Sequence, residues 1–187
     1  MKHILVPIGT SPDIHETLQY AVDFALDFQS QIFVMEVFNA PSARGSLANL
    51  SEKVAAQSKA HLQEVIGKVD SKGISIKIAT YNGKVEEGVK AIDKELGIDL
   101  IIMAPRTNDI QDMYYLGPTS GSIIKRTNIP TLIVPRNTVY APLKNILTAF
   151  KSGMLKRNRI LNPLIQIQNK FKAKISLLLV KTPGYTD

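Results

Sequence analysis

Short apolar runs alternate with longer segments of helical periodicity along residues 1–137. A continuous apolar run such as HILVP near the N-terminus is typical of a strand that is buried on both faces. Between the runs, apolar residues recur at spacings of three and four, which places one apolar stripe along a helix. The pattern predicts strands at 3–7, 32–38, 74–80, 99–104 and 131–135, and helices at 14–28, 50–69, 85–96 and 117–127.

The order of these segments indicates the architecture. Strands alternate with helices, as they do where crossover helices connect parallel strands. We therefore predict an α/β fold, Rossmann-like, in which a five-stranded parallel sheet carries helices on both faces. The run ISIKIAT at 74–80 alternates with period two, so we expect it near a sheet edge. Ligands of such sheets bind beyond the carboxyl ends of the strands, where the strand order reverses.

The last fifty residues repeat the beginning of the chain. ILVPIGTS (4–11) is similar to ILTAFKSG (146–153), and SQIFVMEVF (30–38) is similar to AKISLLLVK (173–181), with helical spacing over 160–171. We therefore expect a first domain at 1–137 and an incomplete second copy at 138–187, a β-α-β half-repeat. Three elements cannot bury a core of their own. We expect this segment to pack on the first domain, to pair with another chain or to belong to a longer protein, and we favour the last.

The positive charge of the chain belongs to the half-repeat. The 187 residues carry 23 Lys and Arg against 16 Asp and Glu, a net charge of +7, yet residues 138–187 hold nine basic groups and one acidic group. The first domain is thus close to neutral, which removes the main support for a nucleic-acid partner. No apolar run approaches the roughly 18 residues of a membrane span. We expect a cytoplasmic protein with no membrane or nucleic-acid partner.

Catalytic chemistry finds little support in the residue types. The chain has no Cys, which excludes disulfide scaffolds, Cys-ligated metals and thiol nucleophiles. His3, His15 and His61 show no metal-ligand or triad spacing, so we expect structural or surface roles for them. Ser11 and Ser120 do not sit in a G-x-S-x-G turn. We therefore predict that the protein is not an enzyme and holds no metal.

Several segments together resemble the universal stress protein family. They are the VPIGTS turn (6–11), the strand DLIIMA (99–104) and the segment LGPTSGSIIKRTNIPTLIVP (116–135). The resemblance covers residues 2–136, and a truncated second copy covers 143–181, as in tandem-domain members. It implies a fold like that of the adenine nucleotide alpha hydrolases and a role in the stress response. It also implies a homodimer, or a pairing of tandem domains, through the last strand, Thr131–Pro135.

The family divides into members that bind ATP and members that do not. Binders carry Gly, two residues, Gly, nine residues, then Gly followed by Ser or Thr, which lets backbone N–H groups approach phosphates. The corresponding positions here are Ala104, Thr107, Gly117 and Pro118, of which only Gly117 matches. Binders also carry an Asp just after the first strand, near the ribose, where this chain has Gly9. The resemblance therefore implies a degenerate nucleotide pocket.

Two functions follow from this pocket. The first is a non-enzymatic regulatory protein that acts by dimerisation or partner binding, without a cofactor. The alternative is a sensor module that binds ATP or a related nucleotide in the same pocket. The start of the helix at 117 could cradle a phosphate, although helix capping explains the same residues more simply, and Glu86 and Glu87 are expected to favour a helix dipole. The candidate pocket residues are Gly9, Thr10, Ala104, Arg106, Thr107, Gly117, Thr119 and Ser120.

Overall fold

The computed structural model describes residues 1–9, 14–40, 48–105, 117–150 and 161–179. They belong to two compact units, Met1–Tyr140 and Ala141–Asp187. The boundary between the units falls between Tyr140 and Ala141, whereas the sequence placed the division at 137/138.

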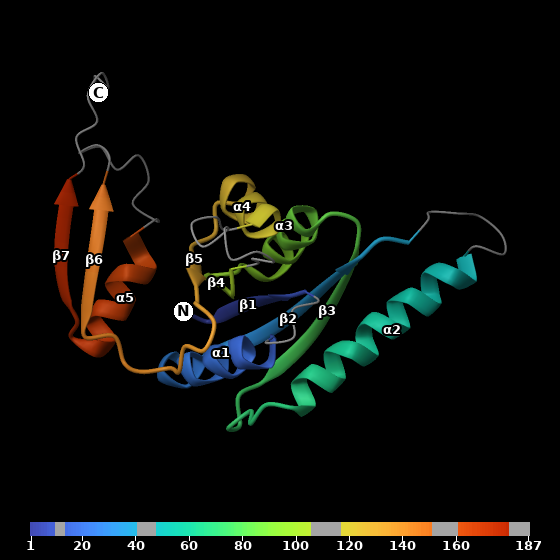
Figure 1. Cartoon of the computed structure of the whole chain (residues 1–187), viewed down its shortest axis with the longest axis horizontal. Helices are drawn as coiled ribbons and strands as arrows, with labels where there is room; N and C mark the ends of the chain where they lie inside the picture. Colours follow the sequence, from blue (N-terminus) through green and yellow to red (C-terminus); the bar gives the residue numbers. More distant parts are fainter. Residues whose placement is uncertain (10–13, 41–47, 106–116, 151–160, 180–187) are drawn as a thin grey trace, which may run out of the picture. The chain divides into compact units, whose positions relative to one another are not determined.

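The first unit is built on a parallel sheet of five strands in the order β3-β2-β1-β4-β5 (Figure 1). The chain moves outward from β1 to β3 and then returns to the other side of β1, so the strand order reverses between β1 and β4. The α/β prediction is confirmed, and β3 lies at the sheet edge that its alternating pattern predicted. The strands are β1 (His3–Ile8), β2 (Gln31–Phe38), β3 (Ile76–Asn82), β4 (Leu100–Met103) and β5 (Thr131–Ile133).

Helices cover both faces of this sheet, as predicted. The helices α1 (Ile14–Phe28) and α2 (Ala48–Gly67) lie on one face, and α3 (Val85–Leu96) and α4 (Gly117–Arg126) lie on the other (Figure 1). Each predicted element of residues 1–137 agrees with the structure to within two residues at either end. The agreement is close because helices on both faces leave the inner strands no exposed side, which gives them continuous apolar runs.

The core on the side of α3 and α4 leads directly to the carboxyl ends of the strands. Leu5 and Ile101 are fully buried at the centre of the sheet, and Met35 and Met103 lie further along β2 and β4. Ile123 of α4 is also fully buried and packs in the same cluster. The position of α4 over the strand ends is therefore fixed by the core.

The second unit consists of β6 (Asn145–Phe150), α5 (Asn162–Phe171) and β7 (Lys174–Leu179), with β6 and β7 paired in parallel. Ile146 lies opposite Ile175, just as Ile4 lies opposite Ile32 in the first unit. These are the positions that the sequence repeat aligned. The two-stranded β-α-β unit is thus present, while its origin as an incomplete second copy stays a prediction.

Candidate functional site

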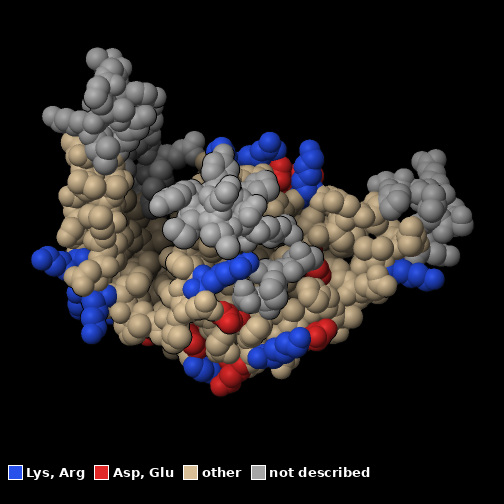
Figure 2. Space-filling view, in the orientation of Figure 1, with Lys and Arg blue, Asp and Glu red and all other residues tan. Residues whose placement is uncertain are grey.

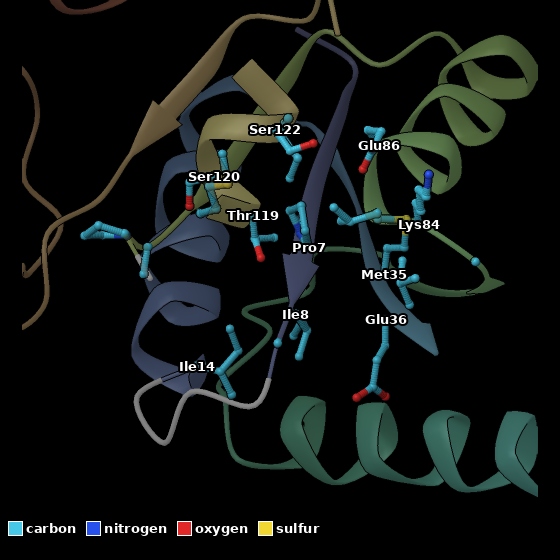
Figure 3. A pocket seen from close by; sticks show the side chains of 18 of the residues that line it. Pro7, Ile8, Ile14, Met35, Glu36, Lys84, Glu86, Thr119, Ser120 and Ser122 are labelled. Carbon is cyan, nitrogen blue, oxygen red and sulfur yellow. The ribbon is translucent and has the colours of Figure 1, made fainter. Parts of the chain in front are cut away.

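A cavity of about 440 Å³ opens at the carboxyl ends of β1, β2 and β4, where the strand order reverses (Figure 3). Parallel strands all end at the same edge, and the helices that follow them leave a crevice there. The volume lies within the range of about 300–1,000 Å³ that is common for small-ligand sites. The sequence predicted a ligand site at this edge, and the cavity occupies that place.

Four of the eight candidate residues line the cavity: Gly9, Ala104, Thr119 and Ser120. Gly117 is the first residue of α4, the helix that carries Thr119 and Ser120. The candidates Thr10, Arg106 and Thr107 lie outside the described residues.

The walls of the cavity are chemically divided. Apolar side chains from the strand ends and from α1 form one part, including Ile8, Ile14 and Met35. Hydroxyl groups of α4 form another part, contributed by Thr119, Ser120 and Ser122. An apolar slot beside a group of hydroxyls suits a ligand that has a flat apolar part and a polar end.

Glu36 lines the cavity although the sequence did not predict it there. It lies near the end of β2, and its Oε2 accepts a hydrogen bond of 2.7 Å from the hydroxyl of Ser58. The Nδ1 atom of His61 lies 3.0 Å from Oε1 of the same carboxylate. Both partners come from α2, and the side chain of Glu36 is only 16% exposed. The signal was a single carboxylate inside the apolar run IFVMEVF, where a strand buried on both faces should carry none.

The structural role expected for His61 is contact with the Glu36 carboxylate. It lies on α2 and holds a carboxylate at the edge of the cavity. Ser58 and His61 each contact Glu36, an arrangement that differs from a catalytic triad, in which the histidine bonds to the serine hydroxyl. Ser58 and His61 thus fix the position of the Glu36 carboxylate.

Glu86 does more than the helix-dipole role that the sequence suggested. It lines the cavity, is 8% exposed, and its Oε1 accepts a hydrogen bond of 2.6 Å from Arg126 of α4. Its own backbone N–H, the Ser122 hydroxyl and the Arg126 guanidinium hold the pKa of Glu86 below its usual value. Glu86 thus remains charged while it joins the start of α3 to α4.

Acidic groups outnumber basic ones among the described residues that line the cavity. Glu36 and Glu86 provide two carboxylates, against the single ammonium of Lys84. The described residues contain no group of three His, Cys, Asp or Glu side chains that could hold a metal ion. One carboxylate, Glu36, therefore lies near β2 and α2, and the other, Glu86, lies beside the hydroxyls of α4, where it is paired with Arg126.

On the face shown in Figure 2, basic side chains are interspersed with acidic ones over the first unit. None of the described helices combines the length and the apolar character that crossing a membrane would need.

Five parallel strands in this order, with a cavity at the point of reversal, define a doubly wound α/β protein. Residues 1–135 match the model of the Universal stress protein family. The chain belongs to this family.

Solved structures share the fold at low sequence identity. A hypothetical protein whose biochemical function was assigned from its structure is 23% identical, with a TM-score of 0.61 over 74% of this chain and 98% of its own. A universal stress protein in complex with cAMP is 14% identical, with a TM-score of 0.57 over 71% and 96%. The universal stress protein from Archaeoglobus fulgidus in complex with dAMP is 12% identical, with a TM-score of 0.51 over 71% and 97%. No curated protein matches the chain.

Proposed function

We propose that the protein is a non-enzymatic regulatory member of its family that binds a nucleotide in the cavity at the strand ends. The observation that carries this proposal is the cavity itself, about 440 Å³ in volume and lined by Gly9, Ala104, Thr119 and Ser120. Of the two functions expected from the sequence, the cavity favours the nucleotide sensor. The apolar part would receive the base, and the hydroxyls of α4 would receive the phosphate.

A nucleotide with one phosphate fits the residues better than ATP does. Thr107 and Pro118 stand where ATP binders carry a glycine and a hydroxyl residue, so the sequence lacks part of the usual triphosphate cradle. Two proteins of the same fold were solved with cAMP and dAMP, each of which carries one phosphate. We propose binding without turnover, and we propose a cytoplasmic location as the sequence suggested.

Calorimetry with AMP, cAMP and ATP, each with and without Mg²⁺, tests the proposal. We expect saturable binding of AMP or cAMP to the wild-type chain at one site. Ala104→Leu adds bulk to the cavity wall and should weaken this binding at least ten-fold, whereas Ala56→Leu on the exposed side of α2 should leave it unchanged. The proposal fails if none of the nucleotides binds, or if the two variants bind equally well.

A second function, homodimerisation, is favoured by the edge of the sheet. Strand β5 pairs with β4 on one side and ends the sheet among the described strands. The carbonyl of Pro130 and the N–H of Val134 bond to β4, and strand geometry therefore turns the N–H groups of Thr131 and Ile133 to the open side. We propose that this edge pairs with a second copy of the chain through main-chain hydrogen bonds.

Sedimentation over a range of concentrations tests the dimer. Thr131→Pro removes one outward N–H and leaves the bonds to β4, so it should shift the chain toward monomer. Thr131→Val removes the same hydroxyl but keeps the N–H, so it should remain dimeric. A wild-type chain that stays monomeric throughout refutes the pairing.

A further inference from the structure

We propose that Glu36 determines the specificity of the cavity, because its carboxylate accepts a hydrogen bond from the uncharged end of the ligand. The donor would be a sugar hydroxyl or an amino group of the base. This end would lie at β2 and α2, and the phosphate would lie at α4. The inference rests on the proposed nucleotide function and adds to it a specificity residue.

Glu36 lies at the edge of the cavity. In the register of the sheet it lies beside Ile8, the last residue of β1, so it stands at the carboxyl edge next to the point of strand reversal. In the view of Figure 3, Glu36 lies on the α2 side of Ile8, while Thr119 and Ser120 of α4 lie on the other side. The cavity therefore has two polar ends separated by apolar strand residues.

Two residues of α2 hold the Glu36 carboxylate in place before any ligand binds. Ser58 donates to Oε2 at 2.7 Å, and Nδ1 of His61 lies 3.0 Å from Oε1. Each oxygen of a carboxylate can accept more than one hydrogen bond, so acceptor capacity remains for a ligand. Positioned acceptors bind at a smaller entropic cost than mobile ones.

The Glu36 carboxylate limits which ligand groups this end of the cavity can accept. A ligand that covers a carboxylate without donating to it leaves a buried acceptor unsatisfied, which is unfavourable. A phosphate at the same place would bring two negative charges together. Hydroxyl and amino groups satisfy the Glu36 carboxylate. At the other end the N-terminus of α4 favours a phosphate, and the carboxylate of Glu86 there is already paired with Arg126.

The turn that follows β1 lacks the carboxylate of the ATP-binding family members. Gly9 stands where ATP-binding members of the family have an Asp near the ribose. In other doubly wound folds, an acidic residue that follows the first helix accepts hydrogen bonds from ribose hydroxyls. Glu36 belongs to the strand that follows α1, and it supplies a carboxylate to the same cavity from the neighbouring strand.

The test compares affinities for AMP, 2′-deoxy-AMP and inosine monophosphate in the wild-type chain and in Glu36→Gln. We expect the wild type to bind AMP at least ten-fold more tightly than one of the other two. Weak binding of 2′-deoxy-AMP identifies the sugar hydroxyl as the donor, and weak binding of inosine monophosphate identifies the base amino group. In Glu36→Gln the ratio should fall below three-fold, and Glu52→Gln on the exposed side of α2 should keep the wild-type ratio.

The ratio of affinities separates this inference from a general loss of folding, which would weaken all three ligands together. Ser58→Ala, which removes one support of the carboxylate, should reduce the ratio while AMP still binds. Equal wild-type affinities for the three ligands, or an unchanged ratio in Glu36→Gln, would overturn the role of Glu36 and leave the proposed function standing. No binding by any of the three would refute both.

Discussion

A single methyl group added at Gly88 should destabilise the first unit, because α3 lies against Tyr81 of β3 at this residue. A Cβ atom built on Gly88 would lie 2.9 Å from Cγ, 3.0 Å from Cβ and 3.1 Å from Cδ1 of Tyr81. Carbon atoms in ordinary contact are about 3.5–4.0 Å apart. The atoms concerned are the root of the tyrosine side chain, so the ring cannot swing away without a shift of helix or strand.

The magnitude follows from two opposing terms. Overpacking of a core costs about 1–3 kcal/mol, and three close contacts place Gly88→Ala in the upper half of this range. Alanine recovers about 1 kcal/mol in a helix interior relative to glycine. The free energy of unfolding should therefore fall by about 1–2 kcal/mol. Gly121 of α4 has no such neighbour within 4 Å, so Gly121→Ala should stabilise by about 0.5–1 kcal/mol.

Urea unfolding followed by circular dichroism measures both changes. The two variants should move the midpoint in opposite directions with an unchanged slope. Replacing Tyr81 by Ala removes the contacts with Cγ and Cδ1 and leaves the one with Cβ, so in that background the cost of Gly88→Ala should fall. The steric explanation is refuted if Gly88→Ala stabilises the wild-type chain as Gly121→Ala does, or if the cost of Gly88→Ala is undiminished without the tyrosine ring.

Three further outcomes can be measured by the same unfolding assay. Leu62→Ala, at a fully buried residue of α2, should cost about 3 kcal/mol, whereas Leu50→Ala at a residue that is 43% exposed should cost less than about 1 kcal/mol. Tyr140 donates a hydrogen bond to Asp27, and burial and this carboxylate raise the pKa of the phenol above its ordinary 10.0. Its stabilising effect should be complete below pH 10 and decline above it, so the advantage of wild type over Tyr140→Phe, about 1 kcal/mol at neutral pH, should shrink in alkali. The pKa of Glu86 is lowered from 4.5 in the folded chain, so wild type should lose stability as the pH falls below about 4.5, and Glu86→Gln should lose less.

The fold could be predicted from the sequence because its determinants are local. Apolar runs such as HILVP and DLIIMA identify strands, and spacings of three and four identify the helices between them. The bounds of α1 and α3 agree with the prediction at both ends. The residues that the repeat aligns occupy equivalent places in the two units, since Ile4 lies opposite Ile32 and Ile146 opposite Ile175.

The site could be predicted only in part, because its charged residues are placed by contacts between distant segments. Glu36 is held by residues 22 and 25 positions later on α2, and no local motif announces that pairing. Glu86 begins a helix, as a local rule explains, yet its partner Arg126 lies 40 positions further along the chain. The location of the cavity followed from topology, whereas the chemistry of its two ends required the packing of α2 and α4.

Loss of a binding motif and loss of a binding site are therefore separate events in this fold. The cavity lies at the ends of the paired strands β1 and β4, where the helices that follow them, α1 and α4, cover opposite faces of the sheet. This is a property of backbone topology that Ala104 or Pro118 does not remove. The motif residues decide which ligand group can approach α4, and Glu36 constrains the opposite end. A chain that loses the motif but keeps the topology should therefore bind a different class of ligand. The original motif selects a ligand mainly through its phosphates, whereas this cavity would select it through both the phosphate end and the uncharged end.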